Sequence, residues 1–356
     1  MGYNVLMQEQ TIIRDAFRQQ SRWCARLGSP FTSLLMSVFA EHLDETSQTG
    51  RAILNWSGSA DPLGDAVPLR LAGALHALVR GGQLPGLAAL YPPNPLPGAD
   101  ELAAAATSAL QEADQTVLDW LRHPPQTNET ARSAALYAGF MTIAHRTGQP
   151  LSLFELGASA GLNLIADRYC YALGGVTAGA ADSPLKLAPE WEGPPPPEAA
   201  VVVAVRQGCD RAPLDVANAH HRERLVGYVW PDQEDRLARV QTAIELARQE
   251  AVSLATEEAA DWVEAKIGLE PVPGLTRVLF HSIAWQYFSN DAQNRINRHM
   301  ERAGANATAD APLAWLAFEQ RDGRGPALSL RLWPGGHEQV LATADAHVSK
   351  VNWLAT

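Results

Sequence analysis

Apolar residues in the first 125 positions recur mainly at the spacing of α-helices. One stretch runs from Ile13 to Gly28, a second from Ser29 to Phe39, a third from Pro68 to Val79, and an alanine-rich one from Glu101 to Leu121. Glycine or proline separates these stretches, as expected at helix ends. The alternation of apolar and polar residues that is typical of strands is missing here. We therefore predict a helical N-terminal region over residues 1–125.

The pattern changes after Pro124-Pro125. Short apolar runs that are typical of buried strands occur at 151–155, 200–205, 251–254 and 278–283. Helical patterns separate them, from Thr127 to about Arg146, from 236 to 249 and from 292 to 303. Three runs near the end, at 313–318, 327–332 and 339–344, are joined by turns and are typical of antiparallel strands. Residues 126–356 are therefore expected to form an α/β domain, with a mostly parallel sheet and an antiparallel C-terminal edge.

One segment, Leu151–Asn163, carries the strongest chemical signal. Its apolar run ends in an acid, Glu155, and the small residues from Gly157 to Gly161 follow before a helical pattern resumes. Glycines let the backbone turn sharply and approach a ligand closely. A helix start offers free N–H groups to a carboxylate or phosphate. The segment therefore predicts a loop that holds a nucleotide-like ligand.

The same letters allow a second interpretation. Gly157-Ala-Ser159-Ala-Gly161 matches the G-x-S-x-G elbow of α/β-hydrolases, with Ser159 as nucleophile and His281 or His337 as a later histidine. Such an elbow normally follows several strands and an oxyanion loop, whereas the chain before Ser159 is helical. This context favours the ligand loop over the hydrolase.

Polar residues also lie at the ends of the other predicted strands. Asp210, Glu257 and His281 lie at or just after strand ends, as Glu155 does, and Trp285 follows His281 closely enough to stack on a ligand. Ligands of open α/β sheets bind beyond the carboxyl ends of the strands. We therefore expect these residues to line one crevice.

This arrangement over residues 126–356 resembles the class I S-adenosylmethionine-dependent methyltransferases. The resemblance implies an acid and a glycine loop after the first strand, further acids at later strand ends, and a closing antiparallel hairpin. It also implies His281 and Trp285 near the transferred methyl group, with His281 either a base or a buried structural residue. The residues that it assigns to S-adenosylmethionine are Glu155, Gly157, Ala158, Ser159, Gly161, Asn163, Asp210 and Glu257.

Polar residues also open the helix after Pro124-Pro125. Thr127 and Asn128 are good N-cap residues, so capping is one role for them. Gln126 and Arg132 are not explained by capping. We therefore assign Gln126, Asn128 and Arg132 as candidate substrate-binding residues.

The whole chain is also similar to a bacterial family of unknown function with a helical N-terminal region and a methyltransferase-like core. The segments that carry this similarity are 69–76, 126–132, 155–163, 229–233 and 333–336. The family implies a fold but no established reaction.

Composition narrows the function classes. The 356 residues hold 28 Lys and Arg against 39 Asp and Glu, a net charge of -11, which argues against nucleic-acid binding. No apolar run is long enough for a membrane span, and the start has no signal-peptide core, so a cytoplasmic location is expected. Three scattered cysteines and the absence of metal-site motifs predict no metal.

The expected function is therefore an S-adenosylmethionine-dependent methyltransferase acting on an unknown small molecule. A non-catalytic small-molecule binder on the same fold is the alternative, because fold does not fix function. The oligomeric state is left open.

Overall fold

The computed structural model describes residues 2–62, 64–321, 323 and 325–355, with side chains from Gln10 onward. The chain forms two compact units. The first contains the residues up to Thr127 together with Asn218–Ala238, and the second contains Asn128–Ala217 and the residues from Arg239 onward. The linear division into 1–125 and 126–356 thus differs from these units at Gln126 and Thr127 and by the segment Asn218–Ala238, which packs with the N-terminal helices.

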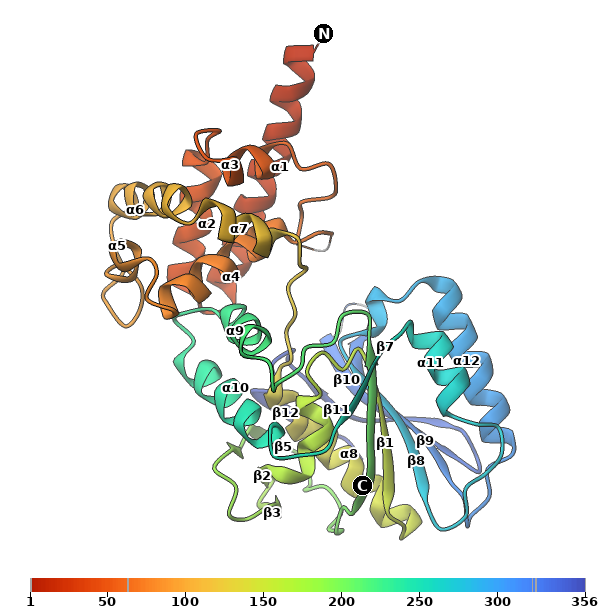
Figure 1. Cartoon of the computed structure of the whole chain (residues 1–356). Coiled ribbons are helices and arrows are strands. Elements are labelled where there is room, and N and C mark those ends of the chain that lie inside the picture. Colours follow the sequence, from red (N-terminus) through yellow and green to blue (C-terminus); the bar gives the residue numbers. More distant parts are fainter. Residues whose placement is uncertain (1, 63, 322, 324, 356) are drawn as a thin grey trace. The chain divides into compact units, whose positions relative to one another are not determined.

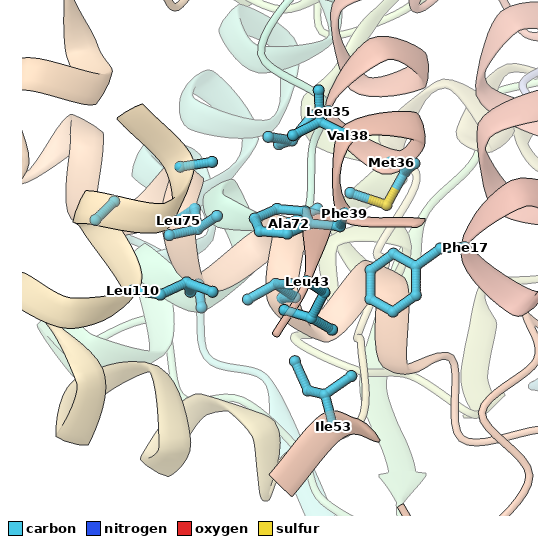
Figure 2. Packing of buried hydrophobic residues seen from close by; sticks show 14 of the residues in the cluster. Phe17, Leu35, Met36, Val38, Phe39, Leu43, Ile53, Ala72, Leu75 and Leu110 are labelled. Atoms are coloured by element: carbon cyan, nitrogen blue, oxygen red, sulfur yellow. The ribbon is translucent and has the colours of Figure 1, made fainter. Parts of the chain in front are cut away.

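The first unit is helical, and α1 to α7 contribute apolar residues to a shared core. Side chains that include Phe17, Phe39, Leu75 and Leu110 meet in this core (Figure 2). The helices are α1 (Gly2–Arg26), α2 (Pro30–His42), α3 (Gln48–Leu54), α4 (Val67–Arg80), α5 (Pro85–Ala88), α6 (Ala99–Glu112), α7 (Asp114–Leu121) and α9 (Ala219–Gly227).

A carboxylate far along the chain completes this helical unit. Asp232 accepts a hydrogen bond from the backbone N–H of Phe31 (2.9 Å) and another from the hydroxyl of Ser29. It therefore caps the first turn of α2, where N–H groups have no partner within the helix. This long-range cap is one reason why residues 218–238 belong to the first unit. The division between the units falls inside α10 (Glu234–Ala247).

The second unit is built on a nine-stranded sheet in the order β5-β12-β11-β10-β9-β8-β1-β6-β7 (Figure 1). Strands β7, β6, β1, β8 and β9 are parallel, and β9 to β12 form an antiparallel edge. The strands are β1 (Leu151–Leu156), β5 (Glu190–Glu192), β6 (Val203–Asp210), β7 (Ser253–Thr256), β8 (Thr276–Ser282), β9 (Leu313–Arg321), β10 (Gly325–Trp333), β11 (Glu338–Ala344) and β12 (Lys350–Trp353).

Helices cover both faces of this sheet. On one face, α8 (Ser133–Thr147) packs against the strands, and Phe140 meets Phe280 of β8 edge to face. On the other face, α11 (Ala259–Lys266) and α12 (Asn290–Ala305) bury Leu279 and Trp315 in a second core. Neighbouring residues of β8 thus point to opposite layers, and this double burial explains its continuous apolar run.

The predicted fold class is confirmed, since the sheet is mostly parallel with an antiparallel C-terminal edge. Gly148 ends α8 as expected, in the left-handed conformation (φ 65°). The helix expected after Gly161 is instead a 3-10 helix, η2 (Leu162–Arg168), with a kink at Ile165. A small sheet of β2 (Cys170–Leu173), β3 (Val176–Gly179) and β4 (Lys186–Leu187) then occupies the crossover to β6.

Candidate functional site

The predicted site residues of the second unit do gather at the carboxyl edge of its parallel strands. Leu156 at the end of β1 pairs with Cys209 of β6 on one side and with His281 of β8 on the other. Asp210 is the last residue of β6 and pairs with the last residue of β7, so Glu257 follows at the same edge. The order of the strands changes direction at β1, which is where open α/β sheets bind ligands.

Glu155 is the most unusual residue of this edge. Its side chain is 2% exposed, and its Oε2 atom is buried without a hydrogen-bond partner among the described residues. Burial raises the pKa of Glu155 well above its ordinary value, and the charge of Asp210 adds to the rise, while a hydrogen bond from Asn163 and the charge of Arg132 oppose it. Buried polar atoms almost always have partners. A carboxyl oxygen left in this state points to a ligand that donates a hydrogen bond.

The loop after β1 is held in an unusual backbone conformation. Gly157, Ser159 and Gly161 all have positive φ, at 64°, 52° and 73°. Asp210 fixes this path, because its Oδ2 accepts from the N–H of Ser159 at 2.9 Å. Asn128 fixes the rest, because its Oδ1 accepts from the N–H groups of Ala160 (3.2 Å) and Leu162 (2.9 Å).

These contacts correct one expectation. The sequence predicted free N–H groups at a helix start, but the loop's N–H groups at 158–162 are bonded within the protein. Asn128 likewise does not cap α8; it holds the loop after β1 instead. The loop therefore lacks the row of free donors that binds a phosphate.

Asn163 links the start of η2 to the buried acid. It donates to Glu155, and its Oδ1 accepts from the hydroxyl of Ser133 at 2.7 Å. All three side chains are buried. Asn163 thus orients Glu155 and is itself oriented by Ser133. Sequence reasoning missed Ser133, because a small polar residue at a helix start is typical of a cap.

Arg132 ties together two loops at this edge. Its Nη1 donates to the carbonyl of Ser282, the last residue of β8, and its Nε donates to the carbonyl of Ala346 after β11, both at 3.0 Å. Nearby, the buried Glu129 pairs with His347 at 3.1 Å. Of the three predicted substrate residues, Asn128 and Arg132 therefore lie at the site's edge. Gln126 belongs to the first unit.

His281 is enclosed by partners on every polar atom of its ring. Its Nδ1 lies 2.7 Å from Oε1 of Glu319, and its Nε2 accepts from the indole N–H of Trp315 at 2.9 Å. Trp285 stacks on the ring at 5.1 Å between centroids. A neutral ring that donates through Nδ1 satisfies both bonds. This geometry favours the structural role for His281 over the role of base.

Glu319 is a site residue that sequence reasoning missed. Besides His281, its Oε1 accepts from the N–H groups of Ala284 (2.9 Å) and Trp285 (3.1 Å), so it holds the turn after β8. That turn is the one that faces Gly157, whose added Cβ would lie 2.9 Å from Cβ of Ala284. The available signal was an acid that directly follows the apolar run Leu313–Phe318.

The histidines expected to serve a hydrolase are not placed for it. Both ring nitrogens of His281 are engaged by Glu319 and Trp315. His337 follows β10, whose last residue, Trp333, pairs with the first residue of β9. The turn that carries His337 is therefore at the opposite edge of the sheet from Ser159.

Two further features concern metal binding and membrane spans. Within the described ranges, no group of three or more His, Cys, Asp or Glu side chains is arranged to hold a metal ion. Among the helices of the same ranges, none combines the length and apolar character needed to cross a bilayer.

Comparison with known proteins identifies the family. The model of a family described as "Uncharacterized protein conserved in bacteria (DUF2332)" matches residues 14–353. No curated protein and no solved structure matches the chain. The match supports the predicted similarity to a bacterial family over nearly the full length of the chain. The description of this family names no methyltransferase activity.

Proposed function

We propose that this chain, a member of that bacterial family, binds S-adenosylmethionine at the carboxyl edge of β1 and transfers its methyl group to a small molecule. The carrying observation is Glu155, a buried carboxyl whose Oε2 has no partner among the described residues. The amino group and the ribose hydroxyls of S-adenosylmethionine are donors of the kind that this oxygen lacks.

The rest of the edge fits the same ligand. Gly157 faces Ala284 so closely that a side chain would fill the space between the two loops. The N–H groups of the loop are bonded internally, which suits a ligand without phosphate better than a dinucleotide. The parallel strands β7-β6-β1-β8-β9 also have the order of the doubly wound sheets.

Each residue of this edge has a distinct part in the proposal. Glu155 accepts from the ligand, and Asn163 orients it. Asp210 and Asn128 keep the loop in its left-handed path, and Arg132 with Glu319 fixes the turn after β8. When bound, S-adenosylmethionine supplies a methyl group on a sulfonium, which leaves readily, so positioning of an acceptor is the chief demand on the protein. A cytoplasmic location is part of the same proposal.

Calorimetry with S-adenosylmethionine and with its demethylated product tests the proposal. We expect micromolar binding to at least one of them, roughly −8 kcal/mol. NAD and ATP serve as controls. Their phosphates need N–H groups as hydrogen-bond donors, and the N–H groups of this loop are already bonded within the protein. Absence of heat with both sulfur ligands, from protein shown to be folded, would overturn the proposal. Binding without turnover on any amine, hydroxyl or carboxyl acceptor would favour the non-catalytic alternative.

Ser159 separates the ligand loop from a hydrolase. We expect no labelling of the protein by a fluorophosphonate probe, since neither His281 nor His337 is placed to activate this hydroxyl. The Ser159→Ala variant should keep the binding of S-adenosylmethionine within about threefold, which mass spectrometry and calorimetry can follow together. Stoichiometric labelling that the alanine variant loses would establish a serine nucleophile instead.

A further inference from the structure

A buried arginine lies near the amino end of β8, at the edge of the sheet opposite to the proposed site. Arg277 is the second residue of this strand and is 3% exposed. It pairs with Ser152 of β1 on one side and with Leu313 of β9 on the other. His281 lies four residues further along the same strand, or about 13 Å away at the usual rise of a strand. Arg277 therefore lies outside the site at the carboxyl edge.

The guanidinium group of Arg277 is only partly bonded. Its Nη1 donates to the carbonyl of Gly268, whereas Nε and Nη2 are buried and have no hydrogen-bond partner among the described residues. Burial lowers the pKa of Arg277, and no neighbouring carboxylate in the described ranges raises it. An arginine nevertheless keeps its charge in a protein. A buried charge without a counter-charge costs free energy, so this group needs an anion.

The positions of the two unbonded donors indicate which kind of anion. Nε and Nη2 lie along one edge of the planar guanidinium, and this edge matches the two oxygens of a carboxylate. The bond from Nη1 to Gly268 holds the other edge in place. Ser152 is buried beside Arg277, and as its in-register partner it faces the same layer, as the next pair, Phe154 and Leu279, also does. Its hydroxyl adds a further donor.

The loop between α11 and β8 covers this edge of the guanidinium. Gly268, Glu270 and Val272 in the loop are exposed. Besides the bond to Arg277, the carbonyl of Leu269 accepts from the side chain of Asn306, and the N–H of Gly274 donates to the carbonyl of Asp310. An exposed loop with few bonds opens more readily than a packed strand. Because Nε and Nη2 are buried beneath it, an anion reaches them only when the loop moves.

We propose that the free edge of Arg277 binds a small carboxylate, which enters when the loop 268–275 moves aside. Acetate is a suitable probe, and acetamide is its uncharged match. Glu270 in the same loop also carries a carboxylate, so the experiment has to distinguish it from a free one. The proposal does not depend on the function proposed for the carboxyl edge.

Saturation-transfer NMR with the full chain tests the site. We expect acetate to bind with a dissociation constant on the order of 1–10 mM, and acetamide at least about 10-fold more weakly. Arg277→Met should lower the affinity for acetate at least about 10-fold, because two charged hydrogen bonds are lost. Arg277→Lys should lower it as well, because an ammonium lacks the planar fork. Arg295→Met is the matched control and should bind acetate as the wild type does, since Arg295 is already paired with Asp261 and Glu264.

Thermal unfolding without acetate distinguishes a free carboxylate from Glu270. Arg277→Met should unfold at a higher temperature than the wild type, because an apolar side chain of similar length replaces an unpaired buried charge. Glu270→Gln should leave the unfolding temperature and the affinity for acetate unchanged.

Three results would overturn the proposal. They are equal binding of acetamide and acetate, an acetate affinity that survives in Arg277→Met, and a lower unfolding temperature in both Arg277→Met and Glu270→Gln. The last result would mean that Glu270 already pairs with Arg277. Should Arg277→Met not fold, Arg277→Lys carries the same comparison, and the preference of the wild type for acetate over acetamide stands by itself.

Discussion

Gly157→Val is expected to abolish the binding of S-adenosylmethionine, while Gly148→Val leaves it intact. Both glycines are left-handed, with φ of 64° and 65°, so both variants incur the same backbone penalty of about 1–2 kcal/mol. They differ in their surroundings. A Cβ at 148 meets nothing within 4 Å, whereas a Cβ at 157 lies 2.9 Å from Cβ of Ala284. The added atoms at 157 therefore wedge the two loops of the site apart.

Calorimetry on both variants, with thermal unfolding as a check of the fold, measures this difference. We expect a loss of affinity of more than 100-fold at 157 and less than twofold at 148. Gly157→Ala is the milder substitution if the valine variant does not fold. Equal affinities of the two variants would show that the ligand does not use the space beside Gly157.

Glu155→Gln should weaken binding and strengthen the fold. The lost carboxylate removes a charged hydrogen bond to the ligand, worth about 1.5–3 kcal/mol, so affinity should fall roughly 10- to 100-fold. The free protein meanwhile loses a buried acid whose Oε2 has no partner among the described residues. We expect its free energy of unfolding at pH 8 to rise by about 1–3 kcal/mol.

The pH dependence gives the sign of this effect. Folding raises the pKa of Glu155 above its unfolded value. The contribution of this side chain to the free energy of unfolding is therefore fully present below the unfolded pKa, near 4.5, and is lost as the pH rises through the folded pKa. Urea unfolding of wild type and variant should therefore diverge from about pH 4.5 upward, with the variant the more stable. Affinity of the wild type for a donor ligand should rise over the same window.

Glu129→Gln is the matched control for this result. Glu129 is as buried as Glu155, but its carboxylate accepts from the N–H of Ala131 and pairs with His347. Its replacement should lower the stability rather than raise it. A stability loss in Glu155→Gln of the same size would mean that Glu155 is satisfied in the free protein.

The sheet was predictable because its strands are short and buried on both faces. The strand β1 begins at Leu151 as expected and ends at Leu156, one residue after the expected end, and the three late runs form β9 to β11 within a few residues. The strand expected at 200–205 is displaced and spans Val203–Asp210, because its second half, from Arg206 to Asp210, pairs with β1, β7 or both. Hydrophobicity alone does not show such a paired polar stretch.

The candidate site was predictable only in part. Acids at strand ends follow from the strand pattern, so Glu155 and Asp210 could be placed at one edge. The bonds that satisfy them depend on partners distant in sequence, such as Asn128 for the loop and Glu319 for the turn after β8. Local sequence patterns do not indicate these pairings, because the partners are far apart in the chain. For the same reason, the cap that Asp232 provides to α2 was not predicted.

That cap has a consequence for synthesis on the ribosome. The N–H of Phe31 and the carboxylate of Asp232 are 201 residues apart. At about 5–20 residues per second, the carboxylate is made roughly 10–40 s after its partner. The N-terminal helices therefore await a segment made only after Asn128–Ala217 of the other unit. A shortened chain that ends at residue 127 would lack this segment, so each unit should be produced only with its distant part.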